Sequence, residues 1–215
     1  MLAPGCPRCP RPVVLDGPGW ACRDHGPVVP LWRPAEASYD AFVAHLERAD
    51  GFPTLLPWPL GPGWHVSSFG VVAAEGGGVL ATVTAVSGTT LLDGPVDVVV
   101  VSEEPGTGIG TRVARLPGDT PSDPGAEPPV TKVRVEQVSV PMWSVSTSAA
   151  PGGGSTDVEL DRSVLVGEES GRWLWLLIRP ASAMLLLRDE WILRDATSIG
   201  PSLVEVPFGG PDPGW

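Results

Sequence analysis

The chain of 215 residues combines many glycines and prolines with an apolar, tryptophan-rich remainder. It contains 27 Gly and 26 Pro, together with 42% hydrophobic residues, nine Trp and only 18% charged residues. This composition excludes a disordered chain, which is poor in aromatic residues and rich in charge. The glycines have no period of three, which excludes collagen. The net charge of −11 argues against partners such as nucleic acid and anionic membranes, because like charges repel.

The first 26 residues contain two pairs of metal-ligand residues. Cys6 and Cys9 form one pair, Cys22 and His25 form the other, and two residues lie between the members of each pair. An odd number of cysteines leaves one thiol over in any disulfide scheme, whereas three thiolates and one imidazole suit a closed tetrahedral zinc site. Gly26 follows His25 and suits the positive φ of such a turn. We therefore predict one structural Zn²⁺ per chain; a redox pair without metal would need a thioredoxin-like context, which does not follow.

The order of the predicted elements suggests three regions. Residues 1–35 form the zinc ribbon, in which a short hairpin carries the second ligand pair. Residues 36–56 contain a short helix and a linker, because apolar residues recur at helical spacing between positions 39 and 46. In this pattern His45 falls on the polar side, where we expect it to be exposed. Residues 57–215 form the core domain.

β-Strand patterns dominate the third region. Glycines 76–78 separate two strands of a predicted hairpin, and a run of β-branched residues predicts a buried strand at 96–102. We predict a mostly β fold with a minor helical part: an N-terminal ribbon, a short helix and a mainly antiparallel core of roughly seven or eight strands. Further strands are expected at 130–138, 158–166, 172–178 and 184–193, the last with a partly helical start after Pro180 as the alternative. Proline- or glycine-rich loops are expected at 117–129 and 148–156.

A glycine-rich loop at residues 105–112 is the one phosphate-like feature. Gly106, Gly108 and Gly110 could direct backbone N–H groups toward an anion, with Arg112 as a charged partner. The spacing matches neither common nucleotide-binding motif, and the preceding Glu103–Glu104 pair would oppose a phosphate unless it binds a metal. A simple turn between strands, with both glutamates at its solvated end, is therefore the favoured interpretation.

Four segments together resemble a known family. They are CPRC and the following ligand pair (residues 6–31), PWPLGPGW (57–64), EEPGTGIGTR (103–112) and DRSVLVGEESGRWLWLLIRP (161–180). The chain is similar to an uncharacterised family of high-G+C Gram-positive bacteria, a domain of unknown function whose members are sometimes labelled phosphotransacetylase. This resemblance implies a bacterial protein headed by a zinc ribbon and supplies no established activity.

Three functions of different classes follow from these observations. The first is a non-catalytic adaptor or regulatory protein with structural zinc and a protein partner. The second is an acyl- or phosphoryl-transfer enzyme of the phosphotransacetylase type that uses the loop 105–112. The third is nucleic-acid binding through the ribbon, whose residues 1–35 carry a net charge of +2; it is disfavoured because the remainder of the chain carries −13. No GxSxG motif occurs, and no residue is assigned as catalytic. With no export signal and no membrane-length apolar stretch in view, we expect a cytoplasmic protein without a membrane partner.

Overall fold

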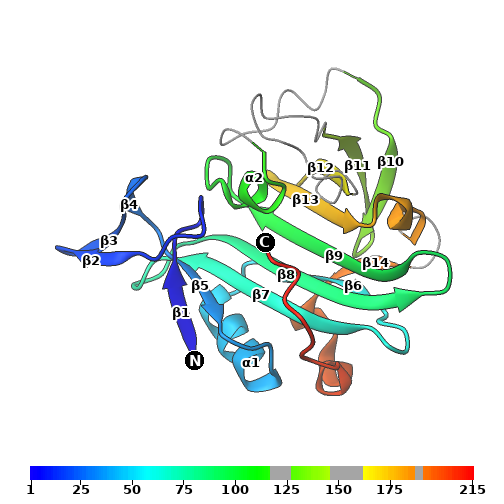
Figure 1. Ribbon diagram of the computed structural model, residues 1–215, viewed down its shortest axis with the longest axis horizontal. Coiled ribbons are helices and arrows are strands. Elements are labelled where there is room, and N and C mark those ends of the chain that lie inside the picture. The colour runs from blue at the N-terminus through cyan, green and yellow to red at the C-terminus, as the bar shows by residue number, and fades with distance from the viewer. Residues whose placement is uncertain (117–126, 146–161, 187–190) are drawn as a thin grey trace.

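The computed structural model describes residues 1–116, 127–145, 162–186 and 191–215. Strands make up most of its regular structure, as one large sheet with a small N-terminal sheet standing at its side (Figure 1). The predicted fold class, mostly β with a mainly antiparallel sheet and few helices, is confirmed. The predicted loop at 148–156 and most of the loop at 117–129 lie outside the described residues.

The large sheet has eleven strands within the described residues. All neighbouring strands are antiparallel except β10 and β14. Eight of the eleven strands, β7 to β14, lie within residues 57–215, which agrees with the seven or eight strands expected for that region. The sheet is larger because three strands of four residues each, β1, β5 and β6, join it from the first 58 residues. The order across the sheet is β1 (Leu2–Gly5), β5 (Leu31–Pro34), β7 (His65–Ala73), β8 (Val79–Thr90), β9 (Gly94–Glu103), β13 (Arg172–Arg179), β12 (Ser163–Glu169), β11 (Val138–Ser144), β10 (Thr131–Val135), β14 (Ile192–Asp195) and β6 (Leu55–Trp58).

The central strands are buried on both faces. Side chains alternate across a strand, so Val98 and Val100 of β9 point into one apolar cluster while Val99 and Val101 point into another. The neighbouring strand β13 divides its side chains in the same way. The run of β-branched residues in β9 therefore forms the buried strand that the sequence predicted.

The sheet curls so that its last strand in sheet order returns to its middle. Thr82 and Thr84 on β8 donate hydrogen bonds from their hydroxyls to the carbonyls of Pro53 and Leu55, at the start of β6. The larger apolar cluster lies inside this curl, and it draws residues from both the early and the late strands. The second cluster lies on the opposite face, where the helix α2 (Ile109–Val113) and Trp215 cover it.

The helix α1 (Tyr39–Ala49) lies where the sequence predicts it, but a different stripe of the helix is buried. The Ser38 side chain caps its first turn by accepting a hydrogen bond from the Ala41 amide. The prediction for His45 was wrong: its side chain is fully buried, stacked on Phe42 with ring centroids 5.6 Å apart. The helix packs on the sheet through Ala41, Phe42, His45 and Ala49, whereas Tyr39 is exposed.

Two further segments refine the predicted strands. Glu136 has a φ of 50°, which turns the chain and divides the predicted strand 130–138 between β10 and β11. In the last predicted strand, 184–193, the expected helical part after Pro180 is the 3₁₀ helix η2 (Ala181–Leu185), and residues 192–193 begin β14; residues 187–190 lie outside the described residues. The other 3₁₀ helices among the described residues are η3 (Ala196–Ser198) and η4 (Gly200–Glu205). Among the described residues, no helix has both the length and the apolar character that crossing a membrane requires.

Candidate metal centre

The N-terminal ribbon is a small sheet that holds two ligand pairs in tight turns. Its strands are β2 (Val14–Asp16), β3 (Gly19–Cys22) and β4 (Gly26–Val28), paired in that order. The first ligand pair lies on the turn after β1; of the second pair, Cys22 ends β3 and His25 lies in the turn before β4. Cys22 pairs with Gly26 across the β3–β4 hairpin, and Gly26 has a φ of 67°, a conformation that favours glycine.

The four predicted ligands come together at one point. The Sγ atoms of Cys6, Cys9 and Cys22 and a ring nitrogen of His25 all lie within 4.8 Å of one another. His25 Nδ1 is 3.6 Å from the sulfurs of both Cys6 and Cys22, and the sulfurs of Cys9 and Cys22 are 3.7 Å apart. A tetrahedral zinc with ordinary Zn–S and Zn–N bonds has ligand–ligand edges of roughly 3.5–3.8 Å. The spacing and the chemistry of these donors fit such an ion, so the cluster could hold a metal.

The environment of the two buried thiols is uneven. Burial raises the pKa of Cys6 to about 11, against the hydrogen bond from the Arg8 amide. Burial also acts to raise the pKa of Cys22, but hydrogen bonds from His25 and the nearby backbone outweigh it and lower that pKa to about 6. A bound cation favours the thiolate form of each cysteine ligand and would therefore counteract the effect of burial on the pKa of Cys6.

The ribbon is fixed against the large sheet by contacts that the sequence did not predict. Trp20 of β3 meets Trp32 of β5 edge to face, with ring centroids 5.8 Å apart. The guanidinium of Arg48, on α1, lies over the Trp32 ring, 4.0 Å from its centroid. Arg112 donates to the carbonyl of Cys6, inside the first ligand turn. Isolated tryptophans and arginines carry no spacing signal, so only the fold reveals these anchors.

The glycine-rich loop encloses a carboxylate of the chain itself. Glu103 Oε2 accepts hydrogen bonds from the amides of Ile109 and Gly110 at 2.9 and 3.2 Å, and its Oε1 accepts one from Trp175 Nε1 at 2.7 Å. Only 2% of Glu103 is exposed, so the expectation of a solvated turn end was wrong for this residue. Burial raises the pKa of Glu103 to about 6, against these three hydrogen bonds.

The three glycines of the loop have conformational and steric roles. Gly106 and Gly108 have φ values of 88° and 82°, and a Cβ on Gly110 would lie 2.2 Å from the Trp175 ring. The Arg112 guanidinium donates a hydrogen bond to the Cys6 carbonyl in the ribbon. The structure therefore does not bring Arg112 and the amides around one empty site, and the anion-binding role stays a prediction.

Fold and site together define a β-rich protein with a possible metal-binding Cys₃His cluster in an N-terminal ribbon. The chain belongs to a family described as "Family of unknown function (DUF6758)", whose sequence model matches residues 1–214. No curated protein and no solved structure matches the chain. Membership of an uncharacterised family agrees with the expected resemblance, whereas the Gram-positive origin and the phosphotransacetylase label remain expectations.

Proposed function

We propose that this chain is a non-catalytic adaptor or regulatory protein whose ribbon is stabilised by one structural Zn²⁺ and binds a protein partner. The closed donor set is the observation that carries the proposal. Three thiolates and one imidazole fill all four positions of a tetrahedral zinc and leave none for a water or substrate. Such an ion contributes folding free energy and provides no open position for catalysis.

The outer strand of the ribbon offers a surface for the partner. β2 is an edge strand of the small sheet, and its adjacent Val14 and Leu15 are 64% and 65% exposed. The ribbon stands clear of the large sheet on this side (Figure 1). An exposed strand edge with apolar side chains suits the addition of a partner's extended segment, through backbone hydrogen bonds and alternate side chains.

The two alternatives have less support. An acyl- or phosphoryl-transfer site would need the inward amides of the loop at residues 105–112, and those of Ile109 and Gly110 already serve Glu103. Nucleic-acid binding would need a basic surface, and the ribbon segment carries only four arginines against two aspartates in a chain of net charge −11.

Metal analysis of the purified chain tests the zinc assignment. We expect about one zinc per chain after purification without added metal. Cys22→Ser should lose the ion, and the matched variant Ala21→Ser on the same strand should keep it. Wild-type protein without metal after gentle purification, or full zinc in Cys22→Ser, would contradict the proposal.

Capture with a photo-crosslinker on β2 tests the adaptor role. In a native lysate, the wild-type chain should crosslink to a defined partner protein, and Val14→Ser/Leu15→Ser should lose this product. Leu91→Ser/Leu92→Ser is the matched control, because these leucines are 105% and 94% exposed on the β8–β9 hairpin, outside the ribbon. Equal crosslinking by all three chains, or by none, would count against an adaptor that uses the ribbon.

A further inference from the structure

Arg112 connects the glycine-rich loop to the first ligand turn of the ribbon. It lies on α2 and is half-buried, and its guanidinium donates a hydrogen bond to the Cys6 carbonyl, in the peptide that joins this ligand to Pro7. In the same turn, the Arg8 amide donates to Cys6 Sγ at 3.4 Å. Arg112 therefore holds the backbone of the turn that presents a ligand sulfur.

The glycine-rich loop positions this arginine. Gly108 precedes α2 with a φ of 82°, and its carbonyl accepts a hydrogen bond from the Arg112 amide at 3.3 Å. The buried carboxylate of Glu103 accepts hydrogen bonds from the amides of Ile109 and Gly110 and so fixes the first turn of α2. The loop thus has a structural task that needs no ligand of its own, because it places a guanidinium against the ribbon.

Arg112 and the two cysteines of the first ligand pair share one cavity. Its volume is about 430 Å³, and Cys6, Cys9 and Arg112 all line it. Burial lowers the pKa of Arg112, and the like charge of Arg33 adds to this effect. The charges of Cys6 and Cys9 act in the opposite direction, so these sulfurs lie close enough to stabilise the guanidinium.

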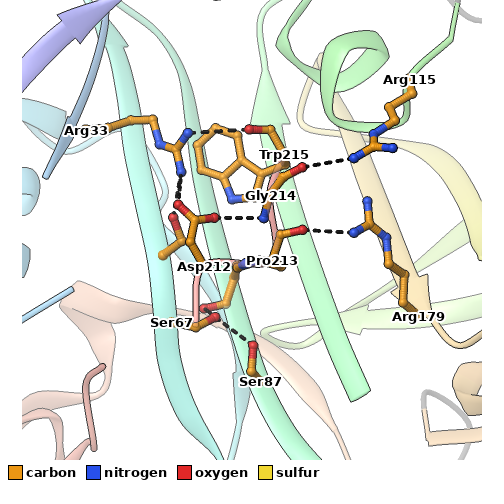
Figure 2. A network of polar contacts seen from close by, with 11 residues as sticks. Arg33, Ser67, Ser87, Arg115, Arg179, Asp212, Pro213, Gly214 and Trp215 are labelled. Atoms are coloured by element: carbon orange, nitrogen blue, oxygen red, sulfur yellow. Dashed lines mark hydrogen bonds and ion pairs between the residues drawn. The ribbon is translucent and has the colours of Figure 1, made fainter. Parts of the chain in front are cut away.

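The neighbouring Arg33 already has its own acidic partner. Its guanidinium pairs with the Asp212 carboxylate at 2.7 Å and donates to the Trp215 carbonyl at 3.4 Å (Figure 2). Arg112, in contrast, has no ion pair with a side-chain carboxylate in the part of the chain that the structure describes. The first ligand pair is therefore the negative partner that the position of Arg112 offers.

An occupied metal centre would complete this pairing. Metal binding removes the protons of the cysteine ligands. Three thiolates exceed the two positive charges of Zn²⁺, so the occupied cluster would carry one excess negative charge. Partly buried charges are screened by salt much less than charges on the surface. The half-buried guanidinium of Arg112 is placed to offset that excess.

We propose that Arg112 is a positioning residue of the metal centre, which orders the Cys6 turn through its carbonyl and offsets the excess negative charge of the three thiolates. The inference rests on the zinc site of the proposed function, and it gives the glycine-rich loop the role of setting Arg112 against the ribbon. Groups that hold metal ligands from outside typically change the metal affinity by about 10–100-fold.

Competition with a chromophoric zinc chelator on the full-length chain measures this contribution. Arg112→Gln keeps a hydrogen-bond donor and removes the charge, so it should bind Zn²⁺ about tenfold or more weakly than wild type. Arg112→Lys keeps the charge and should stay within about threefold of wild type, a rescue that a role in packing alone does not provide. A Co²⁺ titration shows whether each variant keeps the four ligands, because the visible spectrum of bound cobalt reports its coordination.

Arg162→Gln is the matched control. Arg162 likewise donates to a backbone carbonyl beside α2, that of Ala114 at 3.1 Å, but it does not line the cavity of the cysteines. This variant should bind zinc as wild type does. Equal losses of affinity in Arg162→Gln and Arg112→Gln would assign the effect to general destabilisation and overturn the proposal.

The remaining outcomes are also decisive. An affinity of Arg112→Gln within about threefold of wild type would overturn the proposal, and so would an affinity of Arg112→Lys as low as that of Arg112→Gln. If Arg112→Gln does not fold even with zinc, Arg112→Lys decides: an affinity near wild type supports the role of the charge, and a loss of about tenfold or more contradicts it. A wild-type chain that binds neither Zn²⁺ nor Co²⁺ would refute the zinc site itself and this inference with it, a result distinct from weaker binding in the Arg112 variants alone.

Discussion

Acidification from pH 7 to pH 5 should destabilise the protein through one buried imidazole. His45 is fully buried between α1 and the sheet, where its Nε2 lies 3.1 Å from Thr54 Oγ1. Its Nδ1 is also buried and lacks a hydrogen-bond partner among the described residues. Burial lowers the pKa of His45 from 6.5 to about 3. The native state therefore keeps this ring neutral at pH values where the unfolded chain takes up a proton.

The size of the effect follows from proton linkage. Because the folded pKa lies below the unfolded one, the stability contributed by His45 is complete above pH 6.5 and is lost as the pH falls toward 3. Between pH 7 and pH 5 the loss amounts to about 2 kcal/mol. Glu103 opposes it, since its raised pKa of about 6 lets the native state bind a proton first and adds about 1 kcal/mol over the same interval.

A variant isolates the histidine from this opposing effect and from the metal ligands. Urea unfolding of wild type and His45→Gln at pH 7 and pH 5, with zinc present, gives the free energy of unfolding of each protein. We expect His45→Gln to be less stable than wild type at pH 7 and the difference to shrink by about 2 kcal/mol at pH 5. Ile178→Val is the control, because it weakens the same core without removing a titrating group. A stability difference that is the same at both pH values would refute the reasoning.

Two further predictions concern the loop around Glu103. Glu103→Gln should remove the stability that protonation of Glu103 adds at low pH. The free energy of unfolding in urea should therefore fall by about 1 kcal/mol more between pH 7 and pH 5 than it does in wild type. An equal fall in both proteins would contradict the raised pKa. Gly110→Ala should cost about 2–4 kcal/mol and lower the melting temperature, because its Cβ would lie 2.2 Å from the buried Trp175 ring and displace its bond to Glu103. The matched control is Gly76→Ala, which has open space around its Cβ and should melt close to wild type. A melting temperature of Gly110→Ala equal to that of wild type would contradict the steric role of Gly110.

Local patterns predicted the long central strands and the grouping of the four ligand residues. The spacing of Cys6, Cys9, Cys22 and His25 is a property of two short turns, so the sequence alone determines which side chains meet. The run of valines in β9 likewise identifies a buried strand without reference to its neighbours.

Features that depend on long-range packing could not be predicted in this way. The buried stripe of α1 depends on which sheet face lies beneath it, and this decides that His45 is inside. Glu103 becomes buried because Trp175, far along the chain, supplies a donor from the adjacent strand β13. Arg33, Arg115 and Arg179 share no sequence motif, because they come from β5, the segment after α2, and β13; the fold brings all three to the backbone of residues 213–215.

The ribbon also has a consequence for aggregation. It forms the connection between β1 and β5, which pair from Leu2–Pro34 to Gly5–Leu31. Without a metal this connection is a closure of roughly 25 residues, and an unfolded loop of that length costs about 1–2 kcal/mol more than a tight turn. β1 has only four residues to offset this cost. If the ribbon holds the ion that we propose, loss of that ion would therefore free β1 and expose the backbone of β5. A bound ion would then keep β5 paired with the short strand β1, so that the longer-range strands of the sheet do not become available to other chains through β5.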